Sequence, residues 1–233
     1  MKVMQWFLGL IAAFSLIIII LIGSIEIATY ADFSFYQKEY EKYNVKEDVK
    51  MEIEDIMEVT KEMMSYLKGK RADLVVHTVV DGEEREFFND KEKAHMRDVQ
   101  QLFLQGLQLR MLLIIVFIIA IGLLIVLKAD LKKILPWSYQ IGTGLFLLIT
   151  GGLVLLFSTD FTKYFTKFHE MFFTNDLWLL DPATDLMINI LPEGFFMDTA
   201  ARIGIIFAVI MVLTLAISIL FTVWIRKNKK INN

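Results

Sequence analysis

Two of the chain's three histidines stand beside residues that could help them move protons. His95 precedes Asp98 by three positions, and residues at this spacing share one face of a helix, so the carboxylate could orient or charge the imidazole. The alternative is a solvated helix start with an ordinary surface ion pair. Arg97 projects from another side of the same helix, where its guanidinium could bind an anionic group or a nearby loop.

His169 lies in an aromatic stretch whose phenylalanines recur at helical spacing, at positions 161, 165, 168 and 172. Such neighbours would partly desolvate the imidazole, which lowers its pKa and keeps it a neutral base. The alternative is a histidine that happens to stand in an aromatic belt at the membrane interface. The third histidine, His77, lies within a predicted strand, where a structural or cross-strand role is expected.

A second polar cluster follows His169, formed by Asn175, Asp176, Trp178, Asp181 and Asp185. The stretch from Asp181 to Asp185 is equally typical of a turn and a helix cap. Carboxylates near two histidines also leave metal binding open, but no His-x-x-x-His pair occurs, so the metal signal is poor.

Several enzyme classes are excluded by composition. The chain has no cysteine, which rules out a thiolate nucleophile, an acyl-cysteine intermediate and a zinc–thiolate site. No Gly-x-Ser-x-Gly sequence supports a serine nucleophile. The remaining side chains suit a reaction in which the substrate supplies its own nucleophile and the protein moves protons. These residues alone leave acyl transfer, hydrolysis and simple lipid binding open.

The elements that must position these residues include membrane helices. Of the 233 residues, 56% are hydrophobic, and the net charge of −3 gives no basic excess that would favour nucleic acid. A soluble domain of this length would not bury so much apolar surface, so we expect a polytopic α-helical membrane protein. Four apolar runs approach or reach the roughly 20 residues that cross a bilayer. The predicted transmembrane helices are 5–27, 111–127, 134–157 and 203–225.

The orientation follows from the basic residues that flank these runs. They fall on one side, which the positive-inside rule makes cytoplasmic, and comprise Lys2, Lys128, Lys132, Lys133, Arg226, Lys227, Lys229 and Lys230. Trp6, Trp137 and Trp224 mark the same ends, as aromatic belts do. Both termini, the loop 128–133 and the tail 226–233 are therefore predicted to be cytoplasmic. Segments 28–110 and 158–202 are predicted to be extracellular.

The first extracellular segment, 28–110, is expected to be a small α+β domain between the first two membrane helices. An amphipathic helix is predicted from Val45 to Leu67, with a capping box from Asn44 to Glu47 and an end at Gly69. The dipeptide Asp81-Gly82 predicts a hairpin between strands 74–80 and 83–88. Asn89 with Glu92 should cap a helix that continues into the second membrane helix. The second segment, 158–202, is rich in aromatic residues and is expected to lie at the level of the lipid headgroups.

Three stretches together resemble a known family. They are Glu92-Lys93-Ala94-His95-Met96-Arg97-Asp98-Val99, then Phe165-Thr166-Lys167-Phe168-His169-Glu170-Met171-Phe172-Phe173, then Asn175-Asp176-Leu177-Trp178 with Asp181-Pro182-Ala183-Thr184-Asp185. These stretches, with the four-span layout, resemble the lipoprotein intramolecular transacylases, called Lit, of low-GC Gram-positive bacteria.

The resemblance implies an acyltransferase of the bacterial cell membrane whose active site is extracellular. Its substrates would be diacylglyceryl-modified lipoproteins, whose sn-2 acyl chain moves to the α-amino group of the N-terminal cysteine and leaves a lyso-form lipoprotein. Membrane lipid is a further partner, and a monomer without a cofactor or metal is expected. His95 and His169 would be catalytic, one taking the amine proton and the other stabilising the oxyanion or protonating the leaving oxygen. The aromatic setting of His169 favours it as base and Asp98 favours His95 as acid, but the sequence leaves the reverse assignment open. Substrate-binding candidates are Arg97, Asp98, Asn175, Asp176, Trp178, Asp181 and Asp185.

Two other classes remain as alternatives. A transporter subunit of the FtsX and MacB type also places an outer domain between its first two membrane helices. The short cytoplasmic parts predicted here offer an ATPase little to bind. A metal-dependent membrane hydrolase would instead release free fatty acid.

Overall fold

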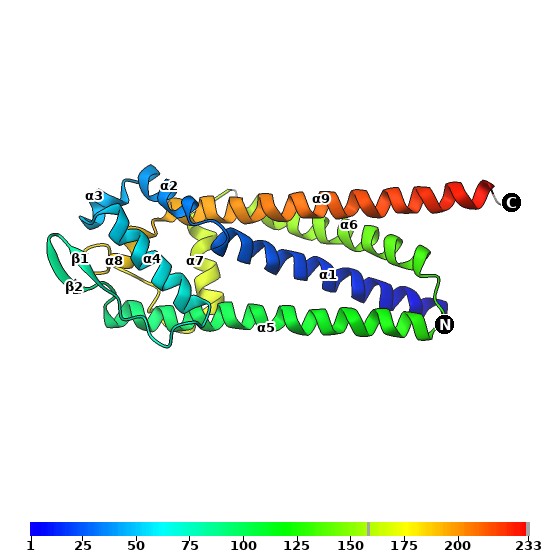
Figure 1. Ribbon diagram of the computed structural model, residues 1–233, viewed down its shortest axis with the longest axis horizontal. Coiled ribbons are helices and arrows are strands. Elements are labelled where there is room, and N and C mark those ends of the chain that lie inside the picture. Colours follow the sequence, from blue (N-terminus) through cyan, green and yellow to red (C-terminus); the bar gives the residue numbers. More distant parts are fainter. Residues whose placement is uncertain (158, 232–233) are drawn as a thin grey trace. The chain divides into compact units, whose positions relative to one another are not determined.

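The computed structural model describes residues 1–157 and 159–231, which divide into two compact units. Unit 1 comprises 1–26, 107–159 and 203–233, and unit 2 comprises 27–106 and 160–202. Figure 1 shows the elements in chain order: α1 (Lys2–Tyr30), α2 (Ser34–Lys42), α3 (Val45–Val49), α4 (Ile53–Leu67), β1 (His77–Val80), β2 (Glu83–Glu86), α5 (Asp90–Val126), α6 (Leu131–Phe157), α7 (Phe161–Phe172), α8 (Leu186–Ile190) and α9 (Glu193–Ile231).

Unit 1 is built from long apolar helices. Within the described residues, α1, α5 and α9 are long and apolar enough to cross a membrane, and the predicted helices 5–27, 111–127 and 203–225 fall almost entirely within them. At 1.5 Å per residue, α5 is about 55 Å long, more than the roughly 30 Å hydrocarbon core requires. Its apolar part begins at residue 111, so the first twenty or so residues of α5 precede the membrane-spanning part. The fourth expected helix, 134–157, is helical as α6, and its crossing of the membrane stays a prediction; position 158 lies outside the described residues.

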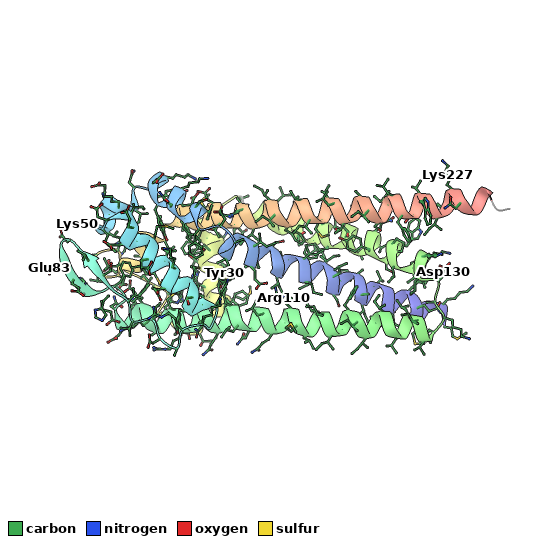
Figure 2. The ribbon with its side chains drawn as sticks, viewed as in Figure 1. Tyr30, Lys50, Glu83, Arg110, Asp130 and Lys227 are labelled. Carbon is green, nitrogen blue, oxygen red and sulfur yellow. The ribbon has the colours of Figure 1, made fainter. Side chains whose placement is uncertain are left out.

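The ends of the unit 1 helices carry its charged residues. Asp130 and Lys227 lie at the same end, and Figure 1 places the N-terminus there too (Figures 1 and 2). Arg110 of α5 lies away from that end and forms an ion pair with Glu26 of α1 (Figure 2). This arrangement agrees with a shared side for both termini, and the side that they face stays a prediction.

Between the helices, the Tyr139 hydroxyl lies 2.6 Å from that of Thr214.

Unit 2 joins both predicted extracellular segments around one hydrophobic core. Tyr40, Ile56 and Phe87 come from the first segment, and Ile190 and Phe195 come from the second. All five side chains are buried, and the rings of Tyr40 and Phe195 stack at 6.3 Å. Burial of this apolar surface is the main force that brings together segments separated by about a hundred residues.

The helical part of unit 2 differs from the prediction in two ways. The helix expected from Val45 to Leu67 is two helices, α3 and α4, because Lys50 takes a left-handed conformation with φ +52°. That break lets both Val49 and Met51 enter the core. Asn44 is also left-handed and its side chain caps nothing, so the expected capping box there was wrong. In addition, α2 was not predicted.

The hairpin and the start of α5 agree with the prediction. Strands β1 and β2 pair antiparallel with Val80 opposite Glu83, and the two turn residues have φ +52° and +80°. Positive φ at both positions is the type I′ geometry that Asp81-Gly82 favours. α4 ends two residues before Gly69, which has φ +71°.

Two of the glycines of unit 2, at positions 82 and 106, should respond oppositely to alanine. Gly82→Ala places a Cβ on a residue with φ +80°, and we expect the free energy of unfolding to fall by about 1 kcal/mol. Gly106→Ala lies in α5 with open space around it, and we expect a gain of about 0.5–1 kcal/mol. Thermal unfolding in detergent measures both. Equal shifts in the same direction would contradict this assignment of the turn.

Candidate active site

His95 and His169 lie together in unit 2, although they are far apart in sequence. His95 stands in the second turn of α5 and His169 near the end of α7. Their ring centroids are 6.2 Å apart and their planes differ by 34°. Only 7% of His95 and 9% of His169 is exposed, so water has little access to either ring. The two histidines singled out by sequence therefore form one buried pair.

The surroundings of His169 select one neutral tautomer. Its Nδ1 lies 2.7 Å from the carbonyl oxygen of Phe165, one turn earlier in α7. A carbonyl only accepts hydrogen bonds, so Nδ1 carries the hydrogen and Nε2 keeps the lone pair. Trp178 stacks on the imidazole at 5.0 Å, and Phe165 contacts it edge-on at 4.4 Å. Burial lowers the pKa of His169, and the bond to the carbonyl partly opposes that shift.

His95 is held neutral more strongly. His95 precedes the membrane-spanning part of α5. Its pKa is lowered from 6.5 to about 4, mainly by burial and secondly by the proximity of His169. The charge of Asp98 opposes this shift but is the smallest of the three effects. The expectation that Asp98 favours the imidazolium form is therefore outweighed by desolvation. Among the described residues, the buried Nδ1 of His95 has no hydrogen-bond partner, and Phe173 contacts the ring edge-on at 5.3 Å.

Asp98 interacts with a candidate site residue. Its Oδ2 accepts a hydrogen bond of 2.9 Å from Nδ2 of Asn175. Arg97 and Asp176 are exposed, and among the described residues the ring of Trp178 contacts that of His169. Three of the seven substrate-binding candidates therefore make such contacts. Trp178 contacts His169, and Asp98 and Asn175 are hydrogen-bonded to each other. A role for any candidate in substrate binding stays a prediction.

Of the other two candidates, Asp185 is buried, whereas Asp181 is exposed and contacts Asp185 through its backbone amide. Asp185 is 3% exposed and accepts hydrogen bonds from Nδ2 of Asn89 at 2.8 Å and from the backbone of Asp181 at 2.7 Å. Nζ of Lys91 lies 3.3 Å from the same carboxylate. These contacts lower the pKa of Asp185 although burial alone would raise it. The carboxylate is thus occupied by the protein's own donors.

Glu92 and Lys91 were not chosen from the sequence as site residues. Glu92 stands three residues before His95, a spacing that two ligands of one metal also use. However, it is fully buried, and its two oxygens accept hydrogen bonds from the backbone amides of Asn89 at 2.7 Å and Met187 at 2.6 Å. The amide of Glu92 donates to Oδ1 of Asn89 at 2.9 Å, which confirms the predicted capping box. The contact with Met187 links the start of α5 to α8, and no local sequence signal could have revealed it.

The site offers two uncharged imidazoles whose available ring nitrogens differ, one carrying a lone pair and the other a hydrogen. His169 presents a lone pair on Nε2, which can accept a proton. If the buried Nδ1 of His95 holds its lone pair, its Nε2–H is free to donate, an arrangement that avoids burying an unpaired N–H. Such a pair can take a proton from a weak acid and stabilise a developing oxyanion.

The apolar helices of unit 1 and the buried pair in unit 2 define a multi-pass membrane protein that carries an acid–base site. A family model described as lipoprotein intramolecular transacylase Lit matches residues 10–196. The match covers most of the chain, and the chain belongs to this acyltransferase family. Comparison with curated proteins gives no match.

Solved structures share this fold. The in meso structure of the membrane-integral lipoprotein intramolecular transacylase Lit from Bacillus cereus superposes with a TM-score of 0.74 at 23% identity, covering 99% of this chain and 100% of that one. Structures of that protein with one histidine replaced by arginine or alanine give TM-scores of 0.74 and 0.73 at 22% identity. The first covers 100% of this chain and 96% of that one, and the second 99% and 97%.

The lowered pKa of His95 predicts that acid destabilises the protein through this residue. The unfolded chain binds a proton near pH 6.5, whereas the folded chain resists protonation until about pH 4. Stability should therefore be fully present above pH 6.5 and fall as the pH drops towards 4. Thermal unfolding of His95→Gln over this range should show a shallower decline than that of the unsubstituted protein. Parallel curves would contradict the burial argument, and His77→Gln serves as the control at an exposed histidine.

Proposed function

We propose that this protein transfers the sn-2 acyl chain of a diacylglyceryl lipoprotein to the α-amino group of its N-terminal cysteine. The observation that supports the proposal most is the buried histidine pair in a chain of this family. The α-amino group has a pKa near 8, so part of it is the free amine near neutral pH, and that amine has one proton to lose as it attacks. Because amine and ester belong to one glyceryl-cysteine unit, the step gains the large proximity advantage of an intramolecular reaction.

His169 is the general base in this proposal. Nε2 takes a proton from the substrate amine as the amine nitrogen attacks the ester carbonyl carbon. The C–O bond to the glyceryl group then breaks, and the same proton passes to the departing glyceryl oxygen. The net change moves one acyl group from oxygen to nitrogen and one proton from nitrogen to oxygen. The hydrogen bond from Nδ1 to Phe165 supports this role because it fixes the reactive tautomer.

His95 acts as a neutral hydrogen-bond donor to the oxyanion in this proposal. A pKa of about 4 makes an imidazolium acid costly before the reaction begins. An Nε2–H directed at the carbonyl oxygen would instead stabilise the charge that develops on it, as other oxyanion donors do. Arg97, Asp98, Asn175, Asp176 and Trp178 remain the nearby candidates for substrate placement.

We also propose that the reaction takes place on the extracellular face, with both termini cytoplasmic and the protein monomeric. The basic flanks of the apolar runs support this orientation. On that face, a site at the membrane surface would meet the amine and the ester of an outer-leaflet diacylglyceryl lipoprotein together.

Alanine at either histidine of the pair should remove the activity. His95→Ala and His169→Ala should each lower the rate of lyso-form production at least about 100-fold, the scale of lost acid–base catalysis. Mass spectrometry of a diacylated reporter lipopeptide, with fragmentation to find the atom that carries the chain, measures the product. His77→Ala, at an exposed residue of β1, should keep full activity. Full activity in both pair variants would refute the mechanism.

The proposed reaction also predicts that acyl chains never exchange between substrate molecules. Two lipopeptides that differ in peptide mass, one with a deuterated sn-2 chain, are mixed with the purified protein. Each product should keep its own chain, because the enzyme forms no covalent acyl intermediate. Crossed products, or enzyme that gains the mass of an acyl group, would point to a different route. Free fatty acid that disappears after chelation would indicate a metal-dependent hydrolase.

A further inference from the structure

The loop that follows α7 contains a tightly turned segment, residues 175–179. Oδ1 of Asn175 accepts a hydrogen bond of 3.1 Å from the amide of Leu177. The amide of Leu179 donates to the carbonyl of Asp176 at 3.1 Å. These local bonds give segment 175–179 a defined shape, and its position against α5 depends on other contacts.

Two side chains of α5 hold the two ends of segment 175–179. Asp98 accepts the 2.9 Å hydrogen bond from Asn175 at one end. Nζ of Lys91 donates to the carbonyl of Leu179 at the other end, over 2.6 Å. Lys91 lies four residues before His95 and Asp98 three residues after it, so all three share one face of α5. The two tethers therefore flank His95 on the helix.

The same tethers flank Trp178 in sequence. Trp178 stands between the two held residues and stacks on His169, with an angle of 29° between the rings. Lys91 is itself fixed by its ion pair with the buried Asp185, which Asn89 also contacts. Trp178 is therefore held against His169 by two hydrogen bonds. Their partners on α5, Lys91 and Asp98, lie on either side of His95.

We propose that Lys91 and Asp98 are positioning residues for the histidine pair, holding segment 175–179 so that Trp178 keeps the ring of His169 in place. This inference rests on the proposed function, because the placement matters to a reaction only if the imidazoles carry it. A stacked indole excludes water from one face of His169 and limits rotation of the ring. Both effects keep Nε2 aligned for proton transfer. Alignment matters because a small misplacement of a catalytic group strongly lowers the reaction rate.

An exchange of residue types between positions 98 and 175 tests the Asp98 tether. Asn175→Asp keeps the acceptor for Leu177 but places a carboxylate against Asp98, so the tether should break. The double variant Asp98→Asn/Asn175→Asp restores a donor opposite an acceptor with the roles reversed. Thr174→Ala, at the exposed neighbouring residue, is the control. Because the tether is exposed, its loss should leave the fold intact.

The kinetic measurement separates positioning from substrate binding. With the reporter lipopeptide, we expect Asn175→Asp to lower kcat about tenfold, with little change in KM, because alignment rather than affinity is lost. The double variant should return to within about twofold of the starting kcat, since the tether is remade. Lys91→Met should resemble Asn175→Asp, and Lys91→Arg should retain most of the activity because it can still donate.

A fluorescence measurement reports the position of Trp178 without any reaction. Trp6, Trp137 and Trp224 are replaced by Phe in the full chain, which leaves Trp178 as the single indole. When His169 gains a proton, the stacked imidazolium interacts with the indole and should quench its emission as the pH falls. Asn175→Asp should lose this step, and the double variant should regain it.

The outcomes distinguish this inference from the proposed function. Loss of both kcat and the fluorescence step in Asn175→Asp, with recovery of both in the double variant, supports the positioning role. Unchanged values in Asn175→Asp overturn it, as does a folded double variant that recovers neither. Loss of kcat with an intact fluorescence step also overturns it, because Asn175 would then act on substrate. If no form transfers an acyl chain, the proposed function fails, and the fluorescence still decides whether the tether positions Trp178.

Discussion

The removal of two imidazoles from water at a centroid separation of 6.2 Å is the constraint on which the rest of unit 2 depends. In water each ring would titrate near neutral pH and rotate freely. Inside the unit, burial makes the charged form of both rings costly, and the proximity of His169 further lowers the tendency of His95 to gain a proton. The result is a pair that is neutral where an exposed pair would be partly charged.

Such burial needs partners for the polar atoms, and the structure provides them unequally. His169 has a carbonyl acceptor for Nδ1 and a stacked indole over its ring. His95 has mainly aromatic contact, and its Nδ1 has no partner among the described residues. This asymmetry is what separates the two proposed roles. A symmetrical pair would give no physical reason to choose a base.

The buried carboxylates of Glu92 and Asp185 perform a related task beside the pair. A carboxylate in a dry environment is tolerated only when donors satisfy its oxygens. Backbone amides satisfy Glu92, and Asn89, Lys91 and the amide of Asp181 satisfy Asp185. The network joins the start of α5 to the chain that leads into α8. These polar contacts thus fix the start of α5 to the chain around Asp185 and Met187.

Local patterns in the sequence were enough to identify the apolar helices, the Asp81-Gly82 hairpin and the capping box between Asn89 and Glu92, because each depends on residues only a few positions apart. Local patterns made His95 and His169 candidates, but they left a plain surface or interfacial role open, and the choice of these two rested on the resemblance to a family; their catalytic role stays a prediction. The break at Lys50 could not be predicted, because it reflects the gain from burying Val49 and Met51 in a core shared with distant residues. The bond from Asp98 to Asn175, and the desolvation that outweighs the charge of Asp98 on His95, likewise arise only when α5 meets α7 and the loop that follows α7. Sequence determined which groups are available for chemistry, and tertiary structure decided which of them meet, since burial and long-range contacts leave no local pattern.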